Sequence, residues 1–191
     1  MIAADRVAVV LLAAGLSRRF GPGDKLLAEI DGKPVAVHAA DMLAGIGFGS
    51  LIAVCGSEPV ADLLGERGFA IVRNDRPDKG QSRSIRLGVE AASENDAILI
   101  CLADMPFVSA GHYRRLLTAH EPGRVAASMA HGIAQPPALF DRTQYDLLLA
   151  LSGDQGAKAL LVGAKLIEAS NNELADIDEP GAIPPPPAPS A

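Results

Sequence analysis

The first 25 residues contain three features that suit the binding of a polyphosphate. An apolar run ends in the small residues Ala13, Ala14 and Gly15, and Arg18 and Lys25 follow it. Small residues let backbone N–H groups approach a ligand closely, and successive N–H groups form a concavity that binds anions. Arginine matches phosphate oxygens with two parallel hydrogen bonds, whereas lysine adds a point charge. The spacing fits neither the Walker A loop nor G-x-G-x-x-G, so a solvated strand-to-helix connection stays an equal alternative.

Aspartates elsewhere in the chain suit a hard cation. Asp104 follows an apolar run and precedes Met105 and Pro106. Magnesium is usually held by one or two carboxylates together with substrate phosphates. Asp176 and Asp178 alternate, which places both on one face of an extended segment, so one of them could supply a second carboxylate. The alternatives are a capping role for Asp104 and a solvated strand end for the other two.

Alternating strands and helices must position these residues. Short apolar runs predict buried strands at residues 6–12, 51–55, 69–72, 97–102 and 125–129. Helical patterns predict helices at residues 34–43, 60–67, 82–92 and 109–120, with Ser109 as one N-cap and Ser82 or Ser84 as another. The alternation predicts a three-layer α/β fold with a doubly wound, mostly parallel sheet. Ligands bind such sheets outside the carboxyl ends of the strands, so the first loop and Asp104 should face one crevice.

The second half of the chain is less regular. Prolines favour an extended segment at residues 135–140. The pattern at residues 154–161 predicts a helix with Asp154 as its N-cap. The polar loop at residues 74–84 offers amide and hydroxyl groups for a base or ribose, although an ordinary mobile loop fits it as well. Residues 184–191 are rich in proline, which is typical of a disordered tail. We therefore expect one domain at residues 1–181 and a tail at residues 182–191.

Composition limits the class of protein. Of the 191 residues, 49% are hydrophobic but only 4% are aromatic, so Ala, Val, Leu and Ile must form the core, as suits a parallel sheet. The net charge of −6 argues against a nucleic-acid partner but not against a nucleotide, which a local basic cluster can hold. No apolar run approaches a membrane span and no signal-peptide pattern is visible, so we expect no membrane partner and a cytoplasmic location.

Cysteine and histidine give weaker indications. Cys55 and Cys101 each end an apolar run and are expected to be buried, reduced thiols. A bridge between them stays open if they lie on neighbouring strands. The four histidines lack metal-ligand spacing, and a substrate role for His131 is a minor alternative.

Several segments together carry a family resemblance. Leu12-Ala13-Ala14-Gly15-Leu16-Ser17-Arg18-Arg19-Phe20-Gly21 with Lys25 resembles the signature loop of the sugar-phosphate and cofactor nucleotidyltransferases. Further matching segments are Asn74 with Gly80-Gln81-Ser82, Ala103-Asp104-Met105-Pro106, Pro137-Ala138-Leu139-Phe140, residues 153–161 and Asp176-Ile177-Asp178-Glu179-Pro180. They follow the family's order over about residues 5–180. Residues 153–161 narrow the resemblance to the MobA-like nucleotidyltransferase family, and within it to the molybdenum cofactor cytidylyltransferases.

The resemblance implies transfer of CMP from CTP to a molybdopterin-type molybdenum cofactor, with release of pyrophosphate and with Mg2+ as cofactor. CTP is favoured because Ala14 stands where GTP-using relatives tend to have a second glycine. The alternatives are a guanylyltransferase that makes molybdopterin guanine dinucleotide, transfer to another phosphorylated small molecule, and a non-catalytic carrier or insertion partner of the cofactor. A molybdoenzyme or its insertion chaperone is the implied protein partner.

The resemblance also implies roles for individual residues. Arg18, Lys25 and Asp104 would be catalytic, and Asp104 with Asp178, or less favourably Asp176, would hold the metal. The implied nucleotide-binding residues are Leu12, Ala13, Ala14, Gly15, Ser17, Arg18, Lys25, Asn74, Gly80, Gln81 and Ser82. The implied acceptor-binding residues are Gln135, Pro136 and Asp154.

Overall fold

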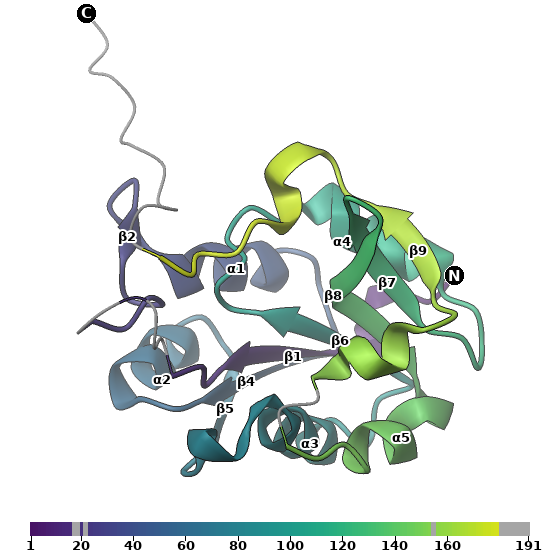
Figure 1. Ribbon diagram of the computed structural model, residues 1–191, viewed down its shortest axis with the longest axis horizontal. Coiled ribbons are helices and arrows are strands. Elements are labelled where there is room, and N and C mark those ends of the chain that lie inside the picture. The colour runs from purple at the N-terminus through teal and green to yellow at the C-terminus, as the bar shows by residue number, and fades with distance from the viewer. Residues whose placement is uncertain (17–19, 21–22, 154–155, 180–191) are drawn as a thin grey trace, which may run out of the picture.

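A seven-stranded sheet in the order β5-β4-β1-β6-β8-β7-β9 forms the centre of the molecule (Figure 1). The computed structural model describes residues 1–16, 20, 23–153 and 156–179. The strands are β1 (Val7–Ala13), β4 (Ser50–Cys55), β5 (Ala70–Arg73), β6 (Ala97–Leu102), β7 (Ala126–Ala130), β8 (Ile133–Asp141) and β9 (Lys165–Glu168). β8 runs antiparallel to both of its neighbours, and the other pairs are parallel. The predicted mostly parallel sheet is therefore confirmed.

Helices cover both faces of this sheet. They are α1 (Val35–Ala44), α2 (Glu58–Gly65), α3 (Gln81–Ala91), α4 (Ala110–Ala119) and α5 (Tyr145–Leu149). Residues of α1, α2 and α4 join one core cluster, and residues of α3 and α5 join the other, which gives the three layers seen in Figure 1. Short 3-10 helices lie at Ala4–Arg6, Pro77–Lys79, Arg142–Gln144, Ala157–Leu161 and Asn171–Leu174. A separate hairpin pairs β2 (Glu29–Ile30) with β3 (Lys33–Pro34).

The pleat of β1 explains why this strand is apolar along its whole length. Val9 and Leu11 face one core cluster, whereas Ala8 and Val10 face the other, and all are fully buried. A strand covered by helices on both faces needs apolar residues at every position. Gly88 lets α3 lie close to this strand, because a Cβ there would stand 2.2 Å from the Val10 side chain. This close packing fixes the start of α3 near the end of β1.

The local predictions have mixed outcomes. The N-cap at Ser109 is confirmed, since its hydroxyl accepts a hydrogen bond from the His112 amide, and residues 135–140 lie within the extended β8. The N-cap at Ser82 or Ser84 is wrong. Gly80, with φ of +87°, precedes the helix, and both serines are buried within its first turns. Of the helix predicted at residues 154–161, residues 157–161 form a 3-10 helix. Asp154 and the tail at residues 182–191 lie outside the described residues.

The two cysteines do not lie on neighbouring strands, because β1 separates β4 from β6. Both thiols are free and buried, so the alternative of a bridge is wrong. Burial raises the pKa of the Cys55 thiol to about 11 and raises the pKa of Cys101 further still. Across the described ranges, none of the helices has both the length and the apolar character that a bilayer crossing requires.

Candidate active site

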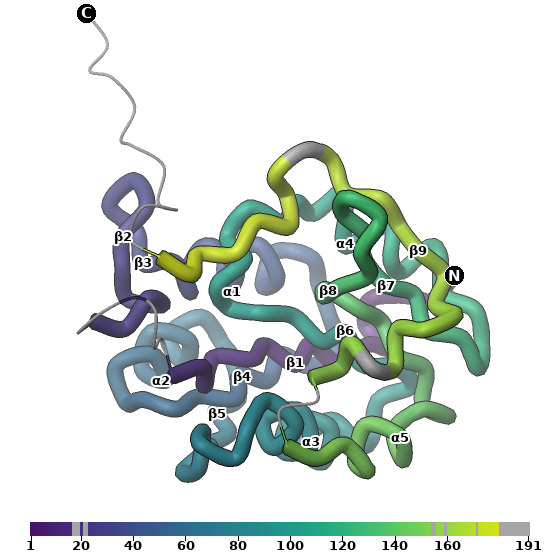
Figure 2. The backbone as a smooth tube through the Cα atoms, viewed as in Figure 1, coloured from purple at the N-terminus to yellow at the C-terminus, as the bar shows by residue number. Residues whose placement is uncertain are grey.

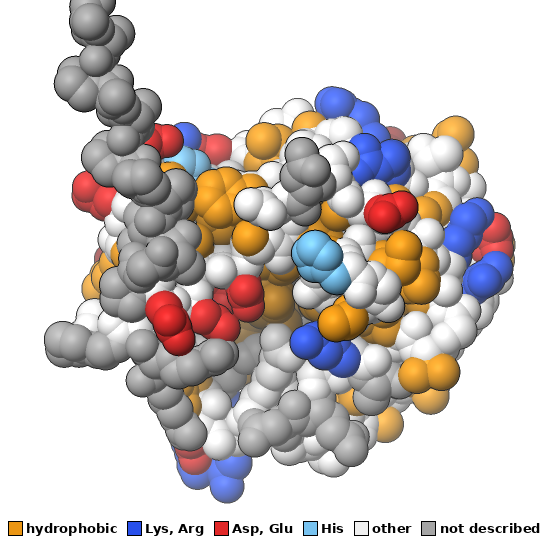
Figure 3. Space-filling model, turned by 45° about the horizontal axis from the view of Figure 1, so that its top comes forward, with side chains coloured by type: hydrophobic (Ala, Val, Ile, Leu, Met, Phe, Trp, Pro, Cys, Tyr) orange, Lys and Arg blue, Asp and Glu red, His pale blue; other side chains and the backbone are white. Residues whose placement is uncertain are grey.

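A cleft of about 420 Å³ opens where β1 and β6 end. The amide of Ala103 donates to the Leu12 carbonyl at 3.1 Å, which ties the exits of these two strands together. The residues lining the cleft are Leu12, Ala14, Gly15, Leu16, Lys25, Leu26, Pro77, Asp78, Gly80, Gln81, Ser84, Leu102 and Asp104. On the face drawn in Figure 3, acidic side chains gather beside a hollow with apolar side chains in it. The expectation that the first loop and Asp104 share one crevice is therefore met in the structure.

The start of the first loop is packed against the end of β4. The Ala13 carbonyl accepts a hydrogen bond from the Gly56 amide at 3.4 Å. A Cβ on Gly56 would lie 3.3 Å from the Ala14 Cα and 3.5 Å from its Cβ, so a residue larger than glycine at position 56 would crowd Ala14. Gly15 and Leu16 are exposed at the cleft. Ser17 and Arg18 lie outside the described residues, so their implied roles stay predictions.

Lys25 is held at the cleft by the turn that contains it. The Asp24 carboxylate accepts a hydrogen bond from the Leu26 amide, and the Leu26 carbonyl accepts one from the Ala36 amide at the start of α1. The Lys25 side chain is only 11% exposed. Its ammonium lies 2.5 Å from Asp104 Oδ2 and 2.8 Å from Asp178 Oδ1. The lysine of the first loop therefore contacts both a strand-end aspartate and one of the two late aspartates.

The backbone brings Asp178 to Asp104. The Ile177 amide donates to the Asp104 carbonyl at 2.9 Å, and the Ile177 side chain is buried in the core. The described C-terminal segment, yellow in Figure 2, runs from β9 toward the side of the molecule on which β2 and β3 lie. Asp176, one residue before Ile177, is exposed. Asp178 therefore contacts Lys25, whereas Asp176 is exposed.

One oxygen of this cluster has no partner. Asp104 Oδ1 is buried, and the described residues provide no hydrogen bond to it. Burial raises the pKa of the Asp104 carboxyl, against the opposing effect of Lys25 and with a further rise from Asp176 and Asp178. For Lys25, burial lowers the pKa, but contacts with Asp104 and Asp178 outweigh it, so the pKa is raised and the side chain keeps its proton. Among the described residues, the cluster therefore joins the Lys25 ammonium to the carboxylates of Asp104 and Asp178.

This donor set fits a hard divalent cation. Two carboxylates converge on the Lys25 ammonium, and one buried oxygen of Asp104 has no hydrogen-bond partner among the described residues. Carboxylate oxygens are the ligands of Mg2+ and Mn2+, which fill their other positions with water and substrate phosphate. Within the described ranges, no group of three or more acidic, histidine or cysteine side chains gathers as a metal shell. Among the described residues, Asp104 and Asp178 are the candidates for protein ligands.

Some residues of the polar loop before α3 line the cleft, and others hold the fold together. Gly80 and Gln81 line the cleft, as the nucleotide prediction requires of them. Asn74 does not. Its side-chain amide donates to Ser84, and its oxygen accepts from the Arg76 amide and from Arg83. Asn74 therefore holds the loop in shape, and its implied contact with the nucleotide stays a prediction.

Ser82 also braces the fold, since its hydroxyl donates to the Gly153 carbonyl at 2.6 Å. This bond fixes the start of α3 to the segment that the resemblance links to the acceptor. Gly156 lies close by, because a Cβ there would stand 2.1 Å from the Gln81 side-chain oxygen. The nucleotide loop and the segment at Gly153 and Gly156 are therefore in contact.

The predicted acceptor residues are not gathered in the cleft. Gln135 and Pro136 lie in β8, half-buried and buried respectively, and neither is among the described residues that line it. Asp154 lies outside the described residues. His131 is exposed in the turn between β7 and β8, with φ of +51°, and does not line the cleft either. An acceptor role for these residues stays a prediction.

Sequence reasoning missed several lining residues. Pro77, Asp78 and Ser84 belong to the polar loop, so reading the whole loop as cleft wall would have found them. Leu26 and Leu102 carry no chemical signal. They line the cleft only because Lys25 and Asp104 are their neighbours or near neighbours in the chain.

Known proteins with similar sequences and structures were found. A sequence model of the MobA-like NTP transferase domain matches residues 9–170. The purine catabolism protein PucB of Bacillus subtilis is 30% identical over 90% of this chain and 91% of its own length. Nicotine blue oxidoreductase of Paenarthrobacter nicotinovorans is 30% identical over 80% of this chain and 79% of its own length.

Solved structures give the same grouping. A nucleotidyl transferase of Methanothermobacter thermautotroptrophicus superposes with a TM-score of 0.79 at 26% identity, covering 92% of this chain and 93% of that chain. Rv0371C of Mycobacterium tuberculosis, solved in complex with manganese, superposes with a TM-score of 0.69 at 22% identity. It covers 85% of this chain and 88% of that chain, and this likeness is one of fold alone.

Proposed function

Because this chain belongs to the MobA-like NTP transferase family, we propose that it transfers CMP from CTP to a molybdopterin-type molybdenum cofactor. The observation that carries the proposal is the meeting of Lys25, Asp104 and Asp178 at the cleft where the first loop begins. Nucleotidyl transfer needs a positive charge and metal-binding carboxylates next to a loop that binds phosphate. Lys25, Asp104, Asp178 and the first loop would supply them. The family supports an enzyme that transfers a nucleotidyl group, and the choice of nucleotide and acceptor is our proposal.

The reaction is an in-line displacement at the α-phosphorus. A phosphate oxygen of the acceptor forms a bond to that phosphorus, the bond to the bridging oxygen of the β-phosphate breaks, and pyrophosphate leaves with its electron pair. Such transfers need little covalent help from the protein, so positioning and charge stabilisation supply most of the catalysis. Backbone amides from Ala13 to Ser17 would hold the β- and γ-phosphates, and Arg18 would clamp them. Lys25 would neutralise charge that grows around the α-phosphorus.

Asp104 and Asp178 would hold a divalent cation, for which Mg2+ is our choice. When bound, the cation would neutralise phosphate charge and bring donor and acceptor phosphates together. The buried, unpaired Asp104 Oδ1 supports this role, because a buried carboxylate oxygen is costly to leave without a partner. The manganese complex of Rv0371C agrees with a divalent cation in this fold. Asp176 is exposed and is the weaker candidate.

The proposal of CTP rests on Ala14. This residue lines the cleft, and its methyl group occupies space there that a glycine would leave open. A pocket narrowed by one methyl group favours a pyrimidine over a purine by about 1–3 kcal/mol. Gly80 and Gln81 line the same cleft and provide backbone and amide groups there.

The test is pyrophosphate release measured with each nucleoside triphosphate, Mg2+ and molybdenum cofactor. We expect release with CTP and a cytidylylated cofactor as the product. Release with GTP alone would identify the guanylyltransferase, and release only with a sugar or alcohol phosphate as acceptor would identify the other transferase. Cofactor binding without turnover by any triphosphate would leave the non-catalytic carrier.

A further inference from the structure

The position of Lys25 has a consequence for cation binding. Its ammonium touches one oxygen of Asp104 and one of Asp178, the two carboxylates that would supply the protein ligands of a divalent cation. Both carboxylate side chains are largely buried, at 17% and 28% exposed. Two carboxylates this close to each other and shielded from water repel strongly unless a cation lies between them. In this structure the chain itself provides that cation.

The ammonium and a divalent cation would need the same two carboxylates. Asp104 Oδ1 is the one buried oxygen of the pair that the structure records as unpartnered, and Lys25 contacts Asp104 Oδ2 and Asp178 Oδ1. A second cation at full contact with both carboxylates would lie beside the ammonium and be repelled by it. Lysine carries its charge on a four-carbon stem with several rotatable bonds, so it can move away while its backbone stays in the turn. The cleft that Lys25 lines provides space for that movement.

We propose that Lys25 is an internal counter-ion that competes with the divalent cation for Asp104 and Asp178, and moves to the nucleotide phosphates when the cation enters. This inference rests on the proposed function for the identity of the second partner of Lys25. Lys25 then has two successive partners, first the two carboxylates and afterwards the nucleotide phosphates. Divalent cation and triphosphate therefore favour each other's binding, because each removes an obstacle to the other. The site binds a divalent cation weakly until a phosphate is present to receive the ammonium.

The first test measures Mn2+ alone, without nucleotide or acceptor, by the loss of the free-ion electron paramagnetic resonance signal. Lys25→Met removes the competing charge and keeps an unbranched side chain of similar length. We expect this variant to bind Mn2+ at least about tenfold more tightly than the wild type, as removal of a unit charge a few ångströms away requires. The matched control is Lys33→Met, because Lys33 pairs with Asp41 in an exposed ion pair at 2.8 Å. The control should bind Mn2+ as the wild type does.

Equal or weaker Mn2+ binding by folded Lys25→Met would overturn the proposal, because the lysine would then be a brace that shapes the site. A second measurement in the wild type covers the case in which Lys25→Met does not fold. With 13C at the ε-carbons of lysine, the Lys25 resonance, assigned by its absence in Lys25→Arg, should shift as Mg2+ is added. A resonance that stays unchanged at saturating Mg2+ would also overturn the proposal.

The outcome is separable from that of the proposed transferase activity. Neither readout involves turnover, so tighter Mn2+ binding by Lys25→Met would stand even if no acceptor were cytidylylated. Conversely, cytidylyl transfer by the wild type together with unchanged Mn2+ binding in the variant would keep the function and remove the counter-ion role.

Discussion

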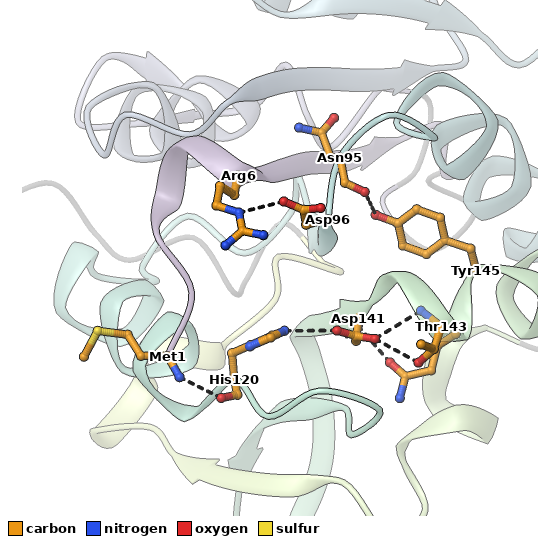
Figure 4. Close-up of polar contacts among 9 residues, drawn as sticks. Met1, Arg6, Asn95, Asp96, His120, Asp141, Thr143 and Tyr145 are labelled. Carbon is orange, nitrogen blue, oxygen red and sulfur yellow. Dashed lines mark hydrogen bonds and ion pairs between the residues drawn. The ribbon is translucent and has the colours of Figure 1, made fainter.

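Charged side chains are buried at the carboxyl ends of β1 and β6 and exposed at their amino ends. At the carboxyl ends, Lys25 and Asp104 are 11% and 17% exposed and one carboxylate oxygen is unpaired. At the amino ends, Arg6 and Asp96 form an ion pair at 2.7 Å with side chains 63% and 45% exposed (Figure 4). An exposed pair has little effect on stability, whereas a buried one is costly to desolvate. The costly arrangement is placed where a ligand would complete it.

The aspartates of the two ends show the same contrast. Asp141, which ends β8 beside the start of β6, accepts hydrogen bonds from the amide and hydroxyl of Thr143 and contacts His120 (Figure 4). Burial raises its pKa, but these contacts outweigh burial and the pKa is lowered. The pKa of Asp104 is raised, since burial there is not fully compensated. Asp141, at one end of the sheet, therefore adds to stability. Asp104, at the other end, remains available to bind a ligand.

The largest expected effect separates the two ends by activity. Asp104→Asn keeps the side-chain shape and leaves Lys25 its contact with Asp178, so we expect a folded protein. Nucleotidyl transfer should fall by about 10³-fold, as when a charge-stabilising group at a reacting phosphate is removed. Circular dichroism checks the fold and pyrophosphate release checks the rate. Wild-type rates in a folded Asp104→Asn variant would contradict the assignment of this end as the active site.

The second effect is the pH dependence of cation binding. A carboxylate must lose its proton to bind a metal, and the pKa of Asp104 is raised above the ordinary aspartate value of 3.8. Mn2+ affinity should therefore be constant above that raised pKa and fall about tenfold per pH unit below it. Electron paramagnetic resonance titrations across the acid range test this.

A variant sharpens this pH test. Asp178→Asn removes a neighbouring negative charge that raises the pKa of Asp104. The variant should bind Mn2+ more weakly overall and lose binding at a lower pH than the wild type. If both proteins lose affinity at the same pH, Asp178 is not part of the titrating cluster.

The third effect concerns stability at the opposite end. Asp141 is the N-cap of the 3-10 helix at Arg142–Gln144 and forms a capping box with Gln144. Asp141→Ala should lower the free energy of unfolding by about 1 kcal/mol at neutral pH. Because the folded pKa of Asp141 is lowered, its contribution is present above the unfolded pKa and disappears as pH falls through the folded pKa. Urea unfolding at several pH values measures this, and a difference that persists in strong acid would exclude the ionic part of the effect.

The smallest effect is expected at the exposed ion pair. Asp96→Asn removes the partner of Arg6 and should change the free energy of unfolding by no more than about 1 kcal/mol, less at high salt. Transfer activity should equal that of the wild type, which makes this variant the control for Asp104→Asn. A large loss of activity in Asp96→Asn would remove the contrast between the two ends.

The sequence predicted the sheet better than it predicted the contacts within the site. Runs such as residues 97–102 are apolar at every position, and this pattern identifies a strand that is buried on both faces. Two of the missed elements, α5 and β9, span five and four residues and give no clear period. Short elements depend on what they pack against, which a single sequence does not show.

The roles of polar residues near the cleft were harder to predict, because they too depend on contacts that a single sequence does not show. Asn74 and Gln81 have similar amide groups and lie in one polar loop, yet Asn74 braces that loop and Gln81 lines the cleft. Residue type does not reveal which way a side chain is turned. Lys25 was predicted to act on phosphate, and in the structure its ammonium contacts two carboxylates. Both assignments agree if its partner changes during the reaction.

The distances along the chain between the members of this cluster bear on how the protein is made. Lys25 lies 79 positions before Asp104 and 153 positions before Asp178. A ribosome releases the chain from its N-terminus, so lysine and the first aspartate can meet as a neutral pair before the second aspartate emerges. Asp178 joins Lys25 and Asp104 only when Ile177 docks and its amide reaches Asp104. A partly synthesised chain would therefore not yet offer the complete cation site.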